Sequence, residues 1–173
     1  MKLETLQELY VAELKDLYSA ETQILKALPK MAEKATNGDL RAGFEDHFQQ
    51  TQEHVARLEQ IFNQLGESPQ GNACEGMEGL LKEGAKVMSE SADPEVCDAA
   101  MISAAQRVEH YEMAGYGCCR SYAQLLGFDS AATLLQKTLD EEKATDKILT
   151  ELAIGHINAG AAAAARYTGI RAA

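Results

Sequence analysis

Acidic residues recur at helical spacing in the second half of the chain, among residues that a folded helix would bury. Glu109 and Glu112 are three positions apart, and Glu142 and Asp146 are four apart. Residues at these spacings share one face of an α-helix, and apolar residues such as Leu139 occupy the same face. A buried carboxylate needs a cation or a proton, because taking it out of water unpaired is costly. The pattern predicts a cluster of acids that holds metal ions.

Glu21 and His54 come from two other segments and are expected at the same depth. In a tight antiparallel pair of helices, residues equally far from the turn lie at the same height, and each residue adds about 1.5 Å. Glu21 is 17 residues before Gly38, and His54 is 16 residues after it. The four acids named above lie 15 to 19 residues from Gly127. Four helices are therefore expected to bring acids or a histidine to one layer.

Carboxylates with one imidazole form a ligand set that iron or manganese accepts. Four helices can hold two such ions through bridging carboxylates. With an open coordination position, the ions can bind O₂ or peroxide, or Fe(II) can be oxidised there. The sequence predicts about two irons per chain, with manganese as the alternative. The expected ligands are Glu21, His54, Glu109, Glu112, Glu142 and Asp146.

The remaining histidines fit this site less well. His47 faces inward but is only nine residues past Gly38, too near the turn, which favours a core position or a supporting contact with a ligand. His110 lies off the inner face of its helix, and His156 lies too far along the last helix. Each predicted ligand also has a simpler interpretation: an exposed helix edge for the acids, and a hydrogen-bonded core residue for His54. Tyr18, Tyr111 and Tyr116 are expected to be core aromatics.

Five helices are expected to position these residues. Apolar residues recur every three or four positions in each, and segments with Gly or Pro separate them. Pro29 predicts a kink or an early end near Ala27 in the first helix, and Asp39 is the expected N-cap of the second. The expected ranges are about 3–34, 40–65, 74–90, 95–126 and 131–158.

The short third helix is about as long as a connection that runs the length of a bundle. The helices before and after it are therefore expected to be parallel, so that one long crossover joins two antiparallel helical hairpins. The fold class is all-α, a four-helix bundle with a short extra helix. Residues 1–159 are expected to form the bundle, and residues 160–173 an alanine-rich C-terminal tail that the pattern leaves unassigned.

Composition supports this class and limits the partners. The chain has 173 residues with three prolines and no Trp, which is typical of an all-α domain. Its net charge of -11 argues against nucleic acid or an anionic membrane as partner. The sequence contains neither a signal peptide nor an apolar run of about 20 residues, so a cytoplasmic protein is expected. The four cysteines form no CxxC pair and are expected to be free thiols rather than zinc ligands.

Four segments carry a resemblance to a known family. They are Asp-Leu-Tyr-Ser-Ala-Glu at 16–21, Met-Glu-Gly-Leu at 77–80, Ala-Ala-Gln-Arg-Val-Glu-His-Tyr-Glu at 104–112 and Glu-Glu-Lys-Ala-Thr-Asp at 141–146. With them the chain resembles the YciE/YciF family of bacterial ferritin-like proteins, over about 6–158. The resemblance implies a ferritin-like four-helix bundle with an extra helix, a homodimer and an association with bacterial stress responses. It implies a metal site more firmly than a particular reaction.

Gln50 departs from the pattern of that family, which commonly has Glu at this position, one turn before His54. A neutral amide is a poorer metal ligand than a carboxylate. The wider ferritin-like class also uses Glu-x-x-His, whereas Gln50 and His54, like Glu142 and Asp146, are four residues apart. A mononuclear, asymmetric or weakened site therefore stays open beside the dinuclear one.

The main functional hypothesis is a di-iron carboxylate protein of bacterial stress response that oxidises Fe(II) or consumes O₂ or peroxide. The alternative is a non-catalytic dimeric stress protein with a vestigial or structural metal site. A third interpretation is a helical bundle that docks a partner and binds no metal.

Overall fold

The computed structural model describes the backbone of residues 3–167 and the side chains of residues 3–164. Within this part of the chain all regular structure is helical. The elements are α1 (Leu6–Lys34), α2 (Gly38–Leu65), α3 (Glu75–Glu90), α4 (Pro94–Leu125), α5 (Asp129–Leu152), a π-helical turn η1 (Ala153–Ile157) and α6 (Asn158–Tyr167).

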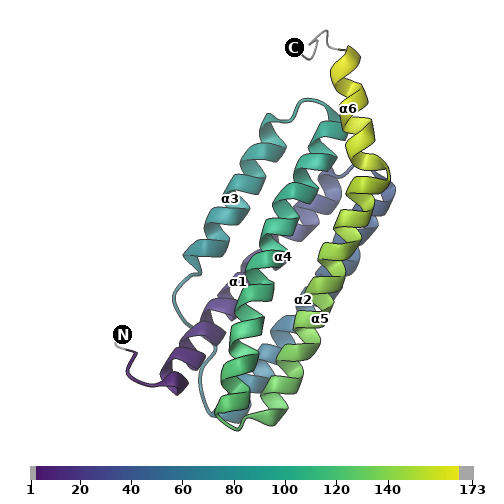
Figure 1. The fold of residues 1–173 in the computed structure, drawn as a ribbon. Helices are drawn as coiled ribbons and strands as arrows, with labels where there is room; N and C mark the ends of the chain where they lie inside the picture. Colours follow the sequence, from purple (N-terminus) through teal and green to yellow (C-terminus); the bar gives the residue numbers. More distant parts are fainter. Residues whose placement is uncertain (1–2, 168–173) are drawn as a thin grey trace.

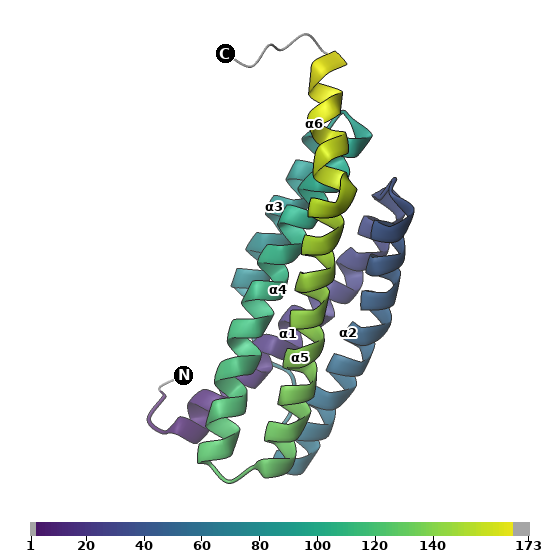
Figure 2. The same cartoon turned by 45° about the vertical axis from the view of Figure 1, so that its right-hand side comes forward.

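Two helical hairpins form the bundle (Figure 1). The hairpin of α1 and α2 packs against the hairpin of α4 and α5, through contacts of α1 with α4 and of α2 with α5. The chain travels back along α3, which packs on α4 and α1, so that α2 and α4 run parallel (Figures 1 and 2). The predicted long crossover with its short helix is therefore confirmed.

Capping residues set the helix starts. The Thr5 hydroxyl accepts a hydrogen bond from the Glu8 N–H, and the Glu8 carboxylate accepts one from the Thr5 N–H, which is a capping box. Asn37 accepts from the Leu40 N–H and Asp93 from the first turn of α4. The expected cap at Asp39 is therefore wrong, because Asn37 stands two residues earlier and its side chain reaches the free N–H group.

The first helix reaches its predicted end at Lys34 in spite of Pro29. Pro29 lies inside α1, which continues to Lys34, so the expected early end near Ala27 does not occur. Pro29 is exposed, and on that face water can hydrate the carbonyl group of Leu25 that lacks its usual N–H partner. Leu28 and Met31 remain in the core on the opposite face, and this packing outweighs the cost of the proline.

A polar layer divides the core into two apolar clusters. One cluster includes Ile24, Phe44 and Met101, and the other includes Leu17 and Leu135. Because Glu21 stands between Leu17 and Ile24 on α1, apolar side chains cover the acids from above and below. The predicted metal-binding layer is thereby buried between two apolar clusters.

Helical structure continues past residue 158, the predicted end of the last helix. After η1, α6 packs against α4, so residues 160–167 of the predicted tail are helical. Residues 168–173 lie outside the described residues. All four cysteines are free thiols, as predicted. No helix within residues 3–167 has the length and apolar character that crossing a membrane requires.

Candidate metal centre

Four helices deliver six buried side chains of types that can ligate a metal to the polar layer. Glu21 comes from α1, His47 and His54 from α2, Glu109 and Glu112 from α4, and Glu142 from α5. None is more than 4% exposed. Such deep burial of four carboxyl groups in one layer is unusual, because ionised groups seldom leave water unpaired.

These side chains form two groups that share Glu142. His47, Glu109, Glu112 and Glu142 each offer a ligand atom within 4.8 Å of the others. Glu21, His54 and Glu142 form the second group by the same measure. Two adjacent groups with a common carboxylate match the way helical bundles hold a pair of metal ions.

The two oxygens of Glu142 face different histidines. Its Oε1 lies 3.0 Å from His54 Nδ1, and its Oε2 lies 4.0 Å from His47 Nε2. His54 Nδ1 is also 3.3 Å from Glu21 Oε1, and His47 Nε2 is 3.4 Å from Glu109 Oε1. Glu142 is therefore placed as a carboxylate that bridges the groups.

Contacts outside the layer orient the ring of His54. Its Nε2 lies 3.0 Å from Glu141 Oε2, which leaves Nδ1 directed at the acids. Glu141 in turn accepts two hydrogen bonds from Arg57, and Arg57 also donates to the Thr138 hydroxyl. A histidine whose second nitrogen is held by a carboxylate is typical of metal sites, where this contact fixes the tautomer and the ring orientation.

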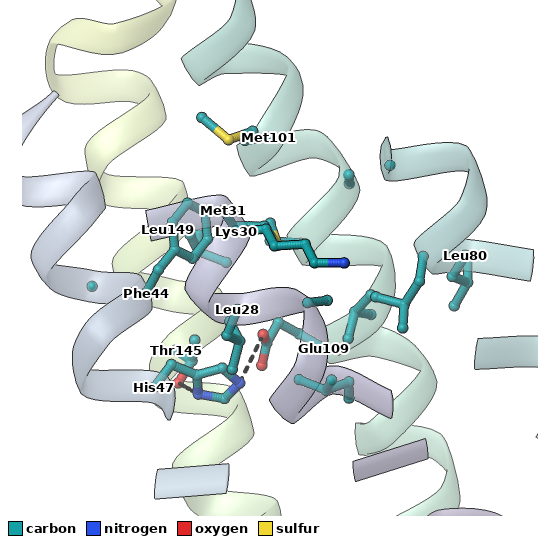
Figure 3. Close-up of a pocket in the computed structure, with 18 of the residues that line it drawn as sticks. Leu28, Lys30, Met31, Phe44, His47, Leu80, Met101, Glu109, Thr145 and Leu149 are labelled. Atoms are coloured by element: carbon teal, nitrogen blue, oxygen red, sulfur yellow. Dashed lines mark hydrogen bonds and ion pairs between the residues drawn. The ribbon is translucent and has the colours of Figure 1, made fainter. Parts of the chain in front are cut away.

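His47 is oriented in the same manner. Its Nδ1 lies 3.3 Å from the Thr145 hydroxyl and 3.4 Å from Gln50 Oε1. Its Nε2 therefore faces Glu109 (Figure 3). Gln50 is exposed and its side chain contacts His47 and Thr145 rather than the acids. Gln50, which departs from the family pattern, thus contacts His47 from outside the layer.

Tyr116 also contacts the layer. The Tyr116 side chain is fully buried, as expected for a core aromatic, and its hydroxyl donates a hydrogen bond to Glu21 Oε1. This contact satisfies one oxygen of Glu21 and leaves the other free. Tyr116 therefore helps to fix the Glu21 carboxylate in the layer.

Seven atoms of the layer are buried without a hydrogen-bond partner among the described residues. They are Glu21 Oε2, His54 Nδ1, Glu109 Oε2 and both carboxylate oxygens of Glu112 and of Glu142. His54 Nδ1 is close to two carboxylates but lacks hydrogen-bond geometry to them. Each buried polar atom without a partner costs about 1–3 kcal/mol, and charged ones cost more. Oxygen-rich donors that converge in this way fit iron or manganese ions.

The electrostatics of the layer lead to the same requirement for positive charge. Burial, together with the charge of Glu142, raises the pKa of Glu109 and of Glu112 well above the ordinary value. Burial also raises the pKa of Glu21, although His54 opposes that effect. Burial alone would lower the pKa of His54, but Glu142 and Glu21 raise it to about 10. The metal-free layer therefore takes up protons, which a metal ion would displace.

Five of the six predicted ligands lie together, and Asp146 lies apart. Its carboxylate accepts a hydrogen bond from Gln106 Nε2 at 3.1 Å and lies 3.4 Å from His110 Nε2. Asp146 follows Glu142 by four residues, so it stands about 6 Å farther along α5. It also lies at the edge of the inner face, where its side chain is 23% exposed.

His47 replaces Asp146 in the layer, although backbone height alone argued against it. His47 and His54 are seven positions apart, which corresponds to a rise of about 10.5 Å, yet their ring centroids are 6.2 Å apart. The two side chains lean toward one another, and an estimate from the backbone misses this reach. Their seven-residue spacing, which places both on one helix face, was the available signal in the sequence. His110 is mostly exposed and His156 contacts Asn37, so both lie away from the layer as expected.

Comparisons with known proteins place the chain in a family. Residues 5–162 match the family model described as "Domain of unknown function (DUF892)". The protein YciF of Escherichia coli (strain K12) is 41% identical over 159 residues, which cover 91% of this chain and 96% of YciF.

Solved structures agree with this placement. The crystal structure described as the E. coli stress protein YciF matches with a TM-score of 0.87, over 90% of this chain and 99% of that chain. YcfI, described as a putative structural protein from Rhodopseudomonas palustris, is 44% identical with a TM-score of 0.84, over 86% of this chain and 95% of that chain. A protein from Xanthomonas campestris shares the fold. It is 20% identical with a TM-score of 0.72, over 96% of this chain and 100% of that chain. The all-α, ferritin-like fold predicted from the sequence is confirmed. The chain belongs to the YciF-like family that the DUF892 model describes.

Proposed function

We propose that this protein binds a pair of iron or manganese ions in the buried layer and uses them to oxidise Fe(II) or to consume peroxide. One ion would be held by His47, Glu109, Glu112 and Glu142, and the other by Glu21, His54 and Glu142. The observation that carries the proposal is the placement of Glu142, whose two buried oxygens lack hydrogen-bond partners and face different histidines. Asp146 is not part of this ligand set.

The chain's own residues have definite tasks at such a site. Glu141 and Thr145 hold the two histidine rings so that one nitrogen of each faces the acids. The layer side chains are buried between apolar clusters, which strengthens the electrostatic interactions within the layer. Bound iron would supply the electrons for the reduction of O₂ or peroxide. Carboxylates freed of their protons would carry the negative charge that stabilises the ions.

Elemental analysis of protein purified from iron-supplemented cells tests the proposal. The wild type is expected to hold about two irons per chain. The chain offers a matched pair of variants one helical turn apart: Glu142→Gln removes the shared ligand, and Asp146→Asn changes an acid outside the layer. Glu142→Gln is expected to lose most of the metal, and Asp146→Asn to keep it. A wild type without metal, or equal loss in both variants, would contradict the proposed site.

A non-catalytic role for the protein is the second candidate, and the R. palustris relative described as a putative structural protein favours it. Consumption of O₂ or peroxide by the loaded wild type separates the two functions. Metal-dependent turnover supports the redox function, whereas bound metal without turnover supports the non-catalytic one.

We further propose that the protein acts as a cytoplasmic homodimer, as the family resemblance implies. Light scattering on the purified protein tests its oligomeric state.

A further inference from the structure

A cavity of about 670 Å³ lies beside the metal-binding layer. This volume is within the usual range for small-molecule sites. Its wall is formed mainly by apolar side chains from α1, α2, α4 and α5, and α3 contributes Leu80 and Leu81 (Figure 3). Among the wall residues are Leu28, Met31, Phe44, Met101, Val108 and Leu149. Such a wall suits an apolar ligand rather than a sugar or a nucleotide.

One end of the cavity reaches the metal-binding layer. His47 and Glu109 line it, and the close-up shows both side chains beside Leu28 and Thr145 (Figure 3). Glu109 Oε2 is one of the buried oxygens without a hydrogen-bond partner. The other four layer residues, Glu21, His54, Glu112 and Glu142, do not line the cavity. A ligand in the cavity would therefore approach the layer from the side of His47 and Glu109.

The cavity is elongated along the bundle. On α1 its lining runs from Gln23 to Met31, and on α4 from Met101 to Glu109. Each span is eight residues, which corresponds to about 12 Å along a helix. Two helices thus indicate the same length independently, and this length suits a medium-length alkyl chain.

Three lysines give the cavity a cationic side. Lys26 and Lys30 are one turn apart on α1, and Lys82 comes from α3, whereas two further acids of the lining, Asp39 and Asp46, are on α2. Lys30 extends from α1 toward Leu80 of α3 (Figure 3). None of the three forms an ion pair with another residue in the part of the chain whose side chains are described. Because the whole chain carries a net charge of -11, an anion would be attracted only where such cations gather.

We propose that this cavity binds a carboxylic acid with an unbranched alkyl chain. The carboxylate lies among Lys26, Lys30 and Lys82, and the alkyl chain follows the apolar wall toward His47 and Glu109. Binding of this ligand is independent of metal. Its placement against bound metal ions rests on the proposed function and would give the substrate class of that site.

Titration calorimetry with dodecanoate, carried out on the full chain, tests the binding. The wild type is expected to bind dodecanoate saturably. The double variant Lys30→Glu/Lys82→Glu is expected to bind at least about tenfold more weakly, because two attractions become repulsions. Lys137→Glu, an exposed charge reversal on α5 away from the cavity, serves as the matched control and should bind as the wild type does. Dodecanol is expected to bind the double variant and the wild type equally.

Two variants that fill the cavity complete this test. Ala105→Phe on α4 and Ala27→Phe on α1 each place a ring in the cavity, from two different helices, and whichever keeps the wild-type circular dichroism spectrum should lose dodecanoate binding. The absence of saturable binding by the wild type would overturn the proposal. Undiminished binding by a folded cavity-filling variant, or by the charge-reversed variant, would overturn it as well.

A fluorine probe separates this proposal from the proposed metal function. Dodecanoate with a terminal trifluoromethyl group is bound to metal-free protein and to protein loaded with Mn(II), whose metal content is measured in the same samples. Loaded protein is expected to broaden the ¹⁹F resonance strongly. Binding without broadening in loaded protein would overturn the placement of the chain. Ligand binding by protein that takes up no metal would support the cavity and contradict only the metal function.

Discussion

At the scale of single residues, the candidate site depends on side chains that lie outside the proposed ligand set. His54 and His47 each present one ring nitrogen to the acids because Glu141 and Thr145 hold the other. Arg57 keeps Glu141 ionised: although partial burial opposes it, the guanidinium group lowers the pKa of that carboxyl. A sequence search for ligands finds the acids but misses this support, because the contacts join α2 to α5 across 81 to 98 positions of the chain.

Replacing Glu141 by Gln tests this support directly. The amide keeps the shape of the side chain but loses the charge that binds Arg57 and orients His54. Metal affinity is expected to fall about 10- to 100-fold, as is usual when an outer contact of a ligating histidine is lost. Titration of the metal-free protein with Mn(II) measures the change. Asp140→Asn, which alters an exposed neighbour on α5, should leave the affinity unchanged, and an equal loss in both variants would contradict the orienting role.

The same layer shows what spacing in a sequence can and cannot predict. The acids and His54 could be found because each helix is regular, so that counting from Gly38 and Gly127 gives the backbone height. Asp146 and His47 were misplaced because side-chain direction and reach are set by packing between helices. Asp146 turns to Gln106 at the edge of α5, whereas His47 leans toward His54.

At the scale of elements, helix ends and topology were largely predictable, because caps and turns act locally. The early break expected at Pro29 does not occur, because packing of Leu28 and Met31 carries α1 to its predicted end at Lys34. Contacts between elements were less predictable from the sequence. Asp98 of α4 is buried and accepts hydrogen bonds from Thr36 N, Thr36 Oγ1 and Asn37 N at 2.7 to 3.0 Å. This carboxylate ties α4 to the turn between α1 and α2.

Asp98→Ala is expected to destabilise the bundle by about 2–4 kcal/mol, because three hydrogen bonds to a charged group are lost and two backbone N–H groups lose their partner. Urea unfolding monitored by circular dichroism measures the loss. Glu83→Ala removes an exposed carboxylate from α3 and should change stability little. A stability equal to that of the wild type in Asp98→Ala would show that this contact does not hold the hairpin turn.

At the scale of the whole molecule, the buried layer couples folding to pH. The pKa values of Glu109 and Glu112 are raised in the folded protein, and that of His54 is raised from its ordinary value of 6.5 to about 10. All three groups hold protons more tightly when folded. Their stabilising contribution is therefore present at low pH and is lost as pH rises, from about 4.5 for the acids up to about 10 for His54.

Metal-free protein should accordingly be less stable at about pH 8 than at about pH 5.5, with the slope set by the excess protons bound in the folded state. Urea midpoints across this range measure the effect. In Glu109→Gln/Glu112→Gln the decline should be shallower, because two of the titrating groups are gone. An increase in stability from the lower to the higher pH in metal-free wild type would contradict the assignment of these carboxyls as proton acceptors in the fold.

Bound metal should offset the loss of stability that the metal-free protein shows at higher pH, because ions that bind the folded layer and not the unfolded chain stabilise the whole bundle. At a free Mn(II) concentration about a thousand times its Kd, the gain is about 4 kcal/mol, which raises Tm by about 10 °C in a chain of this size. Calorimetric scans near neutral pH, with Mn(II) and with a chelator, measure the shift. Asp146→Asn should show the full shift, whereas Glu142→Gln should show little, since its bridging oxygens are replaced. A shift of the same size in both variants would place the stabilising metal elsewhere in the molecule.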